Sequence, residues 1–169
     1  MRILIIEDFR PIAKGFSELF AALGHEVFWV TGFHDVRDLV AITPDGQSKT
    51  IVPGDFDIAF VDGEIEGGKD IDGVAVVARL VLDGLQCVGI STVADLNEKM
   101  RAAGAAVCAQ KVVIFLAFVG ESITPEQLLD GGEEAALAVL NVNLAELNSE
   151  ENRPLRKKGD ALIARYLKS

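Results

Sequence analysis

The sequence predicts an α/β fold with a doubly wound, five-stranded parallel sheet, and three observations lead to this prediction. Over the first 112 residues, short apolar runs alternate with segments of helical periodicity, as expected of buried strands covered by helices on both faces. The length of 169 residues suits one domain with an appendage. Half of the residues are hydrophobic, so burial can offset the entropy cost of ordering the backbone.

Five apolar runs have the length expected of strands, and three segments between them have apolar residues at helical spacing. Each of these segments is followed by a glycine, which commonly ends a helix. The expected strands are residues 2–6, 27–30, 57–61, 87–90 and 106–109, and the expected helices are residues 11–23, 73–83 and 94–103. The residues expected to face the core are Ile12, Phe16, Leu19, Phe20 and Leu23 of the first helix, and Val74, Val77, Ala78 and Val81 of the second.

Two segments depart from a simple alternation of strands and helices. Residues 42–53 are polar and rich in turn formers, where a second helix would otherwise lead into the third strand. We expect an inserted loop or a small hairpin there, around Asp45 and Gly46. Residues 64–68 form an acidic, glycine-containing loop directly after Asp62.

The pattern changes after Lys111. Residues 112–119 are apolar on all sides of a helix, so this helix must be covered on both sides. Thr124 starts a further helix, as a capping residue followed by a proline. Residues 133–147 are predicted to form a helix that covers the apolar one, within the chain or across a dimer, although residues 135–144 would also suit a strand. The leucines with the 3-4-3 spacing that indicates this helix are Leu137, Leu140, Leu144 and Leu147.

A polar break at residues 148–154 precedes a last segment with amphipathic helical periodicity. We therefore expect one domain over residues 1–120 and a helical C-terminal extension over residues 121–169. The apolar residues of the last helix are Leu155, Leu162, Ile163 and Leu167.

Composition argues against several classes of protein. The net charge of −10 argues against nucleic-acid binding, because phosphate neutralisation needs clustered Lys and Arg. The longest apolar run has eight residues, short of the ~20 that a membrane-spanning helix needs, and the chain opens without a secretory signal pattern. Cys87 and Cys108 lack the spacing of a disulfide scaffold or a cysteine zinc site. A cytoplasmic protein without a membrane partner is expected.

Polar side chains follow the predicted strands, where ligands bind to open parallel sheets. Three carboxylates gathered at one edge repel one another and require a cation, and hard oxygen ligands favour Mg²⁺. A hydroxyl and an ammonium beside them would suit a group with several anionic oxygens, so the set indicates phosphoryl transfer. The residues are Glu7 and Asp8 after the first strand, Asp62 after the third, Ser91 and Thr92 after the fourth, and Lys111 after the fifth.

The same residues lie in four ordered motifs, ILIIED, DIAFVDG, VGIST and GAAVCAQK. With these motifs the chain resembles the receiver domain of bacterial two-component response regulators over residues 1–120. The resemblance implies a flavodoxin-like sheet with strand order 2-1-3-4-5. It also implies that Asp62 accepts a phosphoryl group from a histidine kinase or a phosphotransfer protein, giving an acyl phosphate.

The resemblance assigns a role to each of the other polar residues. The side chains of Glu7, Asp8 and Asp62, with the backbone carbonyl of Glu64, would surround Mg²⁺. Lys111 would pair with a phosphoryl oxygen. Ser91 would donate its hydroxyl to another oxygen, and its inward movement would act as the switch. Thr92 takes the small-residue position beside it.

Each of these residues also has an ordinary structural explanation. Asp62 would serve as the cap of the next loop, and Ser91 or Thr92 as the N-cap of the helix that follows. Lys111 alone would be a surface lysine with a partly buried stem. The phosphoacceptor interpretation is favoured because Asp8, Asp62 and Lys111 occur in register.

The chain departs from the family pattern at three places: directly after Lys111, three residues before Lys111, and in the loop after Asp62. Val112 stands where family members have a proline in a cis peptide, so a trans bond is expected there. Cys108 stands where the family has an aromatic residue that reads out the switch. The loop after Asp62 is long, lacks the usual proline, and carries Glu64 and Glu66.

The composition of the C-terminal extension limits the ways in which the chain could pass on a signal. Both histidines, His25 and His34, precede it, so it is not a phosphotransfer domain. Residues 113–169 carry six basic and nine acidic groups and show no helix-turn-helix pattern, so DNA binding is not expected. The chain is therefore predicted to act through protein contacts with a downstream target, with a homodimer through the C-terminal helices as one form of contact.

Three functions are compatible with these residues. The first is a phosphorylation-controlled interaction switch or phosphorelay intermediate, which modifies only itself and is not an enzyme in the turnover sense. The second is a degenerate receiver that binds partners constitutively without taking phosphate. The third is an aspartate-nucleophile phosphohydrolase, but such enzymes have an aspartate where Glu64 stands and place the nucleophile on the first strand rather than the third.

Overall fold

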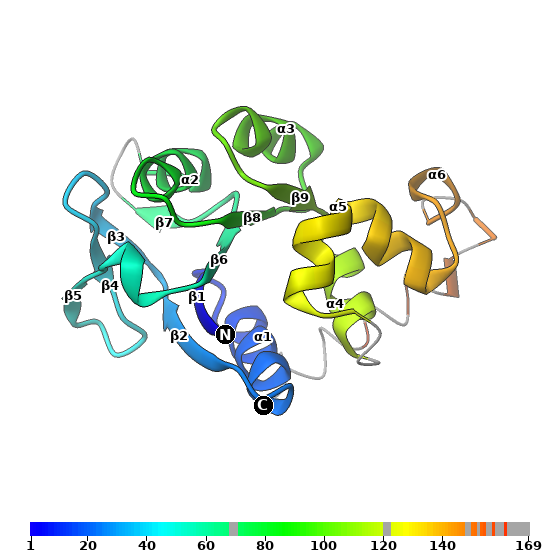
Figure 1. The fold of residues 1–169 in the computed structure, drawn as a ribbon, viewed down its shortest axis with the longest axis horizontal. Coiled ribbons are helices and arrows are strands. Elements are labelled where there is room, and N and C mark those ends of the chain that lie inside the picture. The colour runs from blue at the N-terminus through cyan, green and yellow to red at the C-terminus, as the bar shows by residue number, and fades with distance from the viewer. Residues whose placement is uncertain are drawn as a thin grey trace.

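A computed structural model of the chain describes residues 1–67, 71–119 and 123–147, together with isolated positions between residues 150 and 161. Its main sheet has five parallel strands in the order β2-β1-β6-β8-β9 (Figure 1). Counted within this sheet, the order is 2-1-3-4-5, so the predicted fold class is confirmed. The strands are β1 (Arg2–Ile6), β2 (Glu26–Val30), β6 (Ile58–Asp62), β8 (Cys87–Ile90) and β9 (Val107–Ala109).

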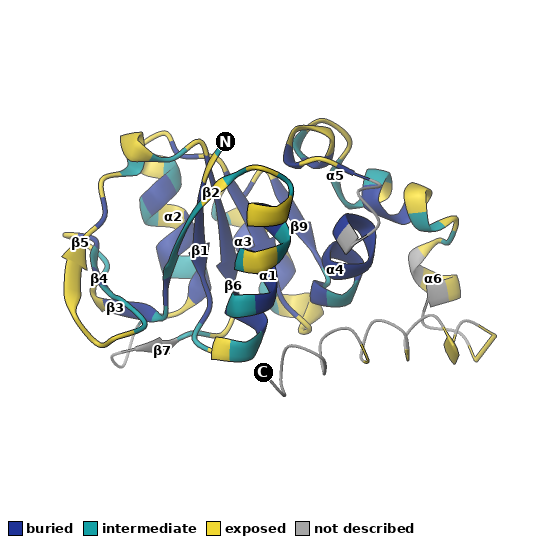
Figure 2. Ribbon diagram, turned by 90° about the horizontal axis from the view of Figure 1, so that it is seen from below, coloured by how far each residue is buried: buried dark blue, intermediate teal, exposed yellow. Residues whose placement is uncertain are grey.

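The central strands are apolar on both sides because both faces of the sheet are covered, as the dark strands of Figure 2 show. Successive side chains of a strand point to opposite faces. Ile3 and Ile5 of β1 therefore join one core cluster, while Leu4 and Ile6 join the other. The sheet lies between these two cores and presents the carboxyl ends of its strands at one edge.

Helices cover both faces of the sheet. The first core takes residues from α1 (Arg10–Ala22) and α4 (Lys111–Val119), and the second takes residues from α2 (Gly73–Leu82) and α3 (Ala94–Ala102). In α1, the buried residues include Ile12, Phe16 and Phe20, as predicted, and Leu19 and the C-cap residue Leu23 are half-buried and pack against the same core.

The predicted inner face of α2 was partly wrong. Val77 is buried, and Val74 and Val81 are half-buried and pack against the second core, as predicted, but Ala78 is exposed. Val76 and Leu80, which were not predicted, are also buried. The helix is apolar almost all round, so its pattern alone does not select a face. The observed face is the one that places Val76, Val77 and Leu80 in the second core, and on the outer side Arg79 donates from Nε to the carbonyl oxygen of Arg37 at 2.8 Å.

A second, small sheet replaces the helix that would otherwise connect the second and third strands of the main sheet. Its order is β5-β4-β3-β7, and Phe33, Leu39, Ala41 and Ile51 of this region fill the second core in place of that helix. The expected hairpin is present, because β4 and β5 pair antiparallel around Gly46, whose φ is 81°. The elements are β3 (Gly32–Asp35), β4 (Val40–Ile42), β5 (Ser48–Thr50), the 3₁₀ turn η1 (Pro53–Asp55) and β7 (Glu66–Gly67).

The acidic loop after Asp62 was expected to have no regular structure, but it contains β7. This short strand pairs parallel with β3, with Gly32 opposite Glu66 and Phe33 opposite Gly67. The small sheet is therefore hydrogen-bonded to the segment that leaves the end of β6.

The apolar helix α4 is covered within the chain by α5 (Pro125–Leu140). Thr124 and Gln127 form a reciprocal capping box at the start of α5, as its Thr-Pro opening indicated. Leu128, Ala136 and Leu137 of α5 lie in the same core as α4. Helix α5 also packs on β9, the edge strand of the sheet, and so covers that edge.

The single helix predicted over residues 133–147 was wrong. Helix α5 ends at Leu140, and Asn141 adopts a left-handed conformation with φ of 56°. Helix α6 (Leu144–Leu147) then starts with its own cap, in which Asn143 and Glu146 exchange hydrogen bonds of 2.8 and 3.0 Å. Asn141 and Asn143 end one helix and begin the next, although the leucine spacing on its own would continue a single helix. The helical conformation up to Leu140 excludes the strand considered for residues 135–144.

Two further expectations fall on residues that the structure does not describe. The predicted boundary at residues 120 and 121 lies outside the described residues, and so do Leu155, Leu162, Ile163 and Leu167 of the last expected helix. Within the described part of the chain, no helix has the length and apolar character needed to cross a membrane.

Candidate functional site

The predicted site residues come together because they follow neighbouring parallel strands. Glu7 and Asp8 follow β1, Asp62 is the last residue of β6, and Lys111 begins α4 after β9. Glu7 is fixed through its backbone, since its N–H donates to the Val30 carbonyl oxygen at 3.1 Å. Its own carbonyl oxygen accepts a 2.8 Å bond from the indole N–H of Trp29 on β2.

The carboxylates of Glu7, Asp8 and Asp62 form a compact acidic cluster. One oxygen from each of these groups lies within 4.8 Å of the others. The Lys111 ammonium is inserted into the cluster, with Nζ 2.7 Å from Asp62 Oδ2 and 2.9 Å from Glu7 Oε2. Glu7 is completely buried, Asp62 is 3% exposed and Lys111 is 9% exposed, so solvent screens these charges little.

Burial and charge act on the ionisation of this cluster. Burial, followed by the adjacent Asp62 carboxylate, raises the pKa of Glu7 from 4.5 to about 8, against the opposing effect of Lys111. Burial alone would lower the pKa of Lys111, but the carboxylates of Glu7 and Asp62 outweigh it and raise that pKa. The lysine is therefore an ammonium at neutral pH, whereas Glu7 largely keeps its proton there.

The backbone around Asp62 is closely packed by two glycines. The Gly63 N–H donates to the Ile90 carbonyl oxygen at 3.1 Å, and the Gly63 carbonyl oxygen accepts from the Gly73 N–H at 3.2 Å. A Cβ on Gly73 would lie 1.9 Å from the Asp62 carbonyl oxygen, so α2 begins in direct contact with the phosphoacceptor candidate. The Asp62 carboxylate accepts the Glu64 N–H on Oδ1 at 3.2 Å and faces Lys111 with Oδ2.

Ser91 and Thr92 differ in environment. Ser91 is completely buried, and its Oγ accepts the Val93 N–H at 3.0 Å. A Cβ on Gly63 would lie 3.1 Å from that Oγ, so the hydroxyl lies beside the residue that follows Asp62. The side chain of Thr92 is exposed.

Asn97 of α3 also belongs to this region, although no sequence pattern pointed to it. It is buried, and its Nδ2 donates to the Ser91 carbonyl oxygen at 3.1 Å. Asn97 therefore anchors the turn that carries the Ser91 hydroxyl.

A pocket of about 440 Å³ opens beside the acidic cluster. Its wall adds negative charge to that of the cluster, because Glu64 and Asp72 line it. The backbone of Glu66 is described as part of β7, but its side chain lies outside the described residues. The lining residues are Asp8, Gly63, Glu64, Ile65, Asp72 and Leu96.

The departures from the family pattern leave the lysine in place. Every peptide bond in the described residues is trans, including the one between Lys111 and Val112, as expected. Lys111 nevertheless contacts both Glu7 and Asp62. Cys108 is buried on β9, and that burial raises the pKa of its thiol, so it packs as a small apolar residue.

Comparison with solved structures identifies the fold. The structure is similar to the non-phosphorylated HemR receiver domain from Leptospira biflexa, with a TM-score of 0.52 and 20% identity, over 73% of this chain and 95% of that one. The chain has a receiver fold. No protein-family model matches the sequence, and no curated protein matches it.

Two other solved structures with the receiver fold are similar at lower TM-scores. The signal receiver domain of a modulated diguanylate cyclase from Desulfovibrio desulfuricans has a TM-score of 0.48 and 26% identity, over 65% of this chain and 80% of that one. The response regulator protein TrrA from Thermotoga maritima, in complex with Mg²⁺-BeF, has a TM-score of 0.49 and 15% identity, over 64% of this chain and 84% of that one.

Proposed function

We propose that this chain is a phosphoryl-accepting response-regulator receiver with Asp62 as the acceptor. The observation that carries the proposal is the contact of the buried Lys111 ammonium with Asp62 Oδ2 at 2.7 Å and with Glu7 Oε2 at 2.9 Å, beside Asp8. A carboxylate nucleophile, a fixed ammonium and further carboxylates are the groups that phosphoryl transfer to an aspartate requires. An ordinary loop-capping aspartate would need none of them.

The donor set suits Mg²⁺. Three carboxylates with ligand oxygens within 4.8 Å of one another offer hard oxygen ligands on one side of the site, and the adjoining pocket leaves space for water. Lys111 supplies only one positive charge against them. Glu7, Asp8 and Asp62, with the Glu64 backbone, would hold the ion. When bound, the ion would neutralise charge on the phosphoryl oxygens.

The chain's own residues have separate roles in the transfer. A carboxylate oxygen of Asp62 attacks phosphorus in line, forming an acyl phosphate. The bond from phosphorus to the donor breaks, and its electron pair leaves with the donor, which is a phosphohistidine nitrogen or a carboxylate oxygen of acetyl phosphate. Lys111 pairs with a phosphoryl oxygen, and the Ser91 hydroxyl donates to another. Hydrolysis of the acyl phosphate returns Asp62 and inorganic phosphate.

The biological role follows from this chemistry. The donor would be a histidine kinase or a phosphotransfer protein, and the output would be contact with a downstream protein. The reaction is confined to the chain's own phosphorylation and dephosphorylation, so the chain would act as a switch or relay intermediate rather than as a turnover enzyme.

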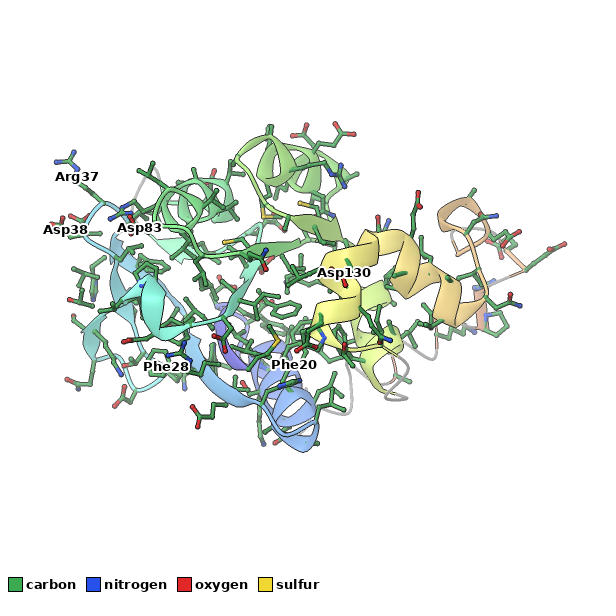
Figure 3. The ribbon with its side chains drawn as sticks, in the orientation of Figure 1. Phe20, Phe28, Arg37, Asp38, Asp83 and Asp130 are labelled. Carbon is green, nitrogen blue, oxygen red and sulfur yellow. The ribbon has the colours of Figure 1, made fainter. Side chains whose placement is uncertain are left out.

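Intact-mass measurement after incubation with Mg²⁺ and acetyl phosphate tests the proposal. The wild-type chain is expected to gain one phosphoryl group, and Asp62→Asn is expected to gain none. Asp130→Asn is the matched control, because Asp130 is an exposed residue of α5 (Figure 3) and does not belong to the acidic cluster. This variant should be modified like the wild type.

Two results would contradict the proposal. Modification that persists in folded Asp62→Asn would place the phosphoryl group on another residue. A folded wild-type chain that neither binds Mg²⁺ nor takes phosphate from acetyl phosphate or a phosphohistidine donor would instead be a constitutive binding module.

A further inference from the structure

A hydrogen bond joins α5 to the turn that carries the lysine of the site. The Gln110 N–H donates to Glu133 Oε1 at 3.1 Å. Gln110 lies between β9 and α4, and its own carbonyl oxygen accepts from Val113 and Ile114 in the first turn of α4. The next residue is Lys111. Glu133 therefore holds the backbone immediately before the buried ammonium.

The backbone of α5 is shaped to bring Glu133 to this position. Gly132 has a φ of 65°, which interrupts the helix immediately before Glu133. A side chain at that position would be strained because φ lies in the left-handed region. After the kink, Ala136 and Leu137 are buried in the core shared with α4. Glu133 thus belongs to a segment whose place is fixed by packing.

The packing of α4 alone does not determine where Lys111 points. The helix is apolar on nearly all sides, with Val113 to Phe118 all buried. An evenly apolar helix gains similar burial at several rotations about its axis. Phe115 and Phe118 seat the helix on aromatic rings of the core. The turn at its N-terminal end is held by polar contacts, which are the Glu133 bond to Gln110 and the bonds of Lys111 to Glu7 and Asp62. A carboxylate at that end also interacts favourably with the helix dipole.

We propose that Glu133 is a positioning residue for Lys111 and that α5 is thereby coupled to the acidic cluster. The coupling is reciprocal, because a phosphoryl group that draws Lys111 away from its present partners would change the turn held by Glu133. Its role in phosphorylation rests on the proposed function, but the contact between the two elements does not. In this arrangement α5 of the C-terminal extension influences the position of Lys111, and so regulates the site.

A double-mutant cycle tests the coupling without any phosphorylation. Urea unfolding with a chelator present would compare wild type, Glu133→Ala, Lys111→Met and the double variant. Because Glu133 acts through Lys111, we expect Lys111→Met to remove at least about half of the midpoint shift that Glu133→Ala causes in the wild-type background. Additive shifts would overturn the proposal, whatever the chain does with phosphate.

Phosphoryl uptake from acetyl phosphate at saturating Mg²⁺ provides the functional readout. We expect Glu133→Ala to slow uptake by at least about tenfold, because a displaced catalytic group costs that much or more. Glu133→Gln keeps an acceptor oxygen and should restore uptake to within about twofold of wild type. If Glu133 acted only through its negative charge, Glu133→Gln would be as slow as Glu133→Ala. Glu134→Ala is the matched control, because Glu134 is the adjacent, exposed glutamate.

The outcomes separate the two proposals. No uptake by wild type, together with a non-additive cycle, would contradict the proposed function and leave the coupling standing. Normal uptake by folded Glu133→Ala, or equal loss in Glu133→Gln and Glu133→Ala, would overturn the positioning role. If Glu133→Ala does not fold, Gly132→Ala takes its place in both experiments. Gly132→Ala should also slow phosphoryl uptake, and unchanged uptake would overturn the proposal.

Discussion

At the residue scale, the site combines groups that are costly to bury separately. Glu7 is completely buried and next to Asp62, and both face one ammonium, that of Lys111. An isolated buried charge would be strongly destabilising, whereas paired charges compensate one another in part. Because one ammonium does not offset burial and the neighbouring Asp62 carboxylate, ionisation of Glu7 is unfavourable in the fold, and a divalent cation would favour it.

This imbalance predicts a pH dependence of stability. The pKa of Glu7 is raised to about 8 in the fold, from 4.5, so the folded state binds this proton more tightly than the unfolded state. Its contribution is fully present below about pH 4.5 and is lost as pH rises through about 8. With a chelator present, the free energy of unfolding of wild type relative to Glu7→Gln should therefore fall between about pH 5 and pH 8, by a few kcal/mol.

Urea unfolding at each pH measures this difference, and Glu7→Gln is the matched reference because its amide does not titrate. Mg²⁺ should oppose the loss, because its ligands must be deprotonated, and it should stabilise wild type most near pH 8. A difference between the two proteins that is flat from pH 5 to pH 8 would show that Glu7 ionises normally in the fold.

Residue types at strand ends were enough to predict which charged groups meet. Glu7, Asp8, Asp62 and Lys111 lie together because parallel strands end at a common edge, a property that can be inferred from their positions in the sequence. Trp29, Asn97 and Glu133 could not be predicted in the same way. Each acts through a bond to a distant backbone group, and such bonds leave no local periodicity or motif.

At the scale of elements, strands were easier to predict than the faces of helices. A buried strand is a continuous apolar run, whereas an apolar helix such as α2 offers several similar faces, and the face that is buried depends on packing against distant residues of the core. The small sheet was only partly predictable, because the turn at Gly46 is local but the pairing of β3 with β7 is not. Asn141 ended α5 despite a leucine spacing that favoured continuation.

The contact between α2 and β6 gives a prediction at this scale. A Cβ at Gly73 would lie 1.9 Å from the Asp62 carbonyl oxygen, so either α2 or the end of β6 must move to accept it. We expect Gly73→Ala to lower the free energy of unfolding by about 3 kcal/mol or more, as overpacking against backbone does. Phosphoryl uptake should fall as well, because the displaced atoms belong to Asp62.

Gly54→Ala is the matched control for this substitution. Gly54 lies in η1, and a Cβ there would meet no atom within 4 Å, so its free energy of unfolding should stay within about 0.5 kcal/mol of wild type. Urea unfolding of both variants makes the comparison. Equal stability of the two variants would mean that α2 moves away from Asp62 at little cost.

At the scale of the whole molecule, the charge of the chain opposes the substrates of the proposed reaction. The net charge is −10, and the pocket beside the acidic cluster is lined by Asp8, Glu64 and Asp72. A small anionic phosphodonor therefore approaches against an unfavourable potential, focused by the walls of the pocket. A protein donor can offset this repulsion with basic residues of its own, so the same charges would favour a complementary partner over a free small molecule.

Salt should therefore speed phosphorylation by acetyl phosphate. At saturating Mg²⁺, the second-order rate constant for phosphoryl uptake should rise several-fold between ionic strengths of about 0.05 and 0.5 M, because screening weakens repulsion between like charges. The Glu64→Gln/Asp72→Asn double variant should be faster than wild type at low salt and less sensitive to salt. Asn retains the capping role of Asp72, whose side chain accepts the Ala75 N–H at the start of α2.

A second double variant separates the pocket from the overall charge. Asp38→Asn/Asp130→Asn removes two exposed charges, whose positions Figure 3 labels. Neither residue lines the pocket, so this variant changes the net charge by the same amount without changing the pocket. If the pocket acids govern the approach of the donor, this control should keep most of the wild-type salt dependence. Equal effects of the two double variants would assign the repulsion to the net charge of the chain, and a rate that falls with salt would contradict electrostatic repulsion altogether. The acids after Asp62 would then have to act on the lifetime of the acyl phosphate, which dephosphorylation of the purified phosphorylated chain measures directly.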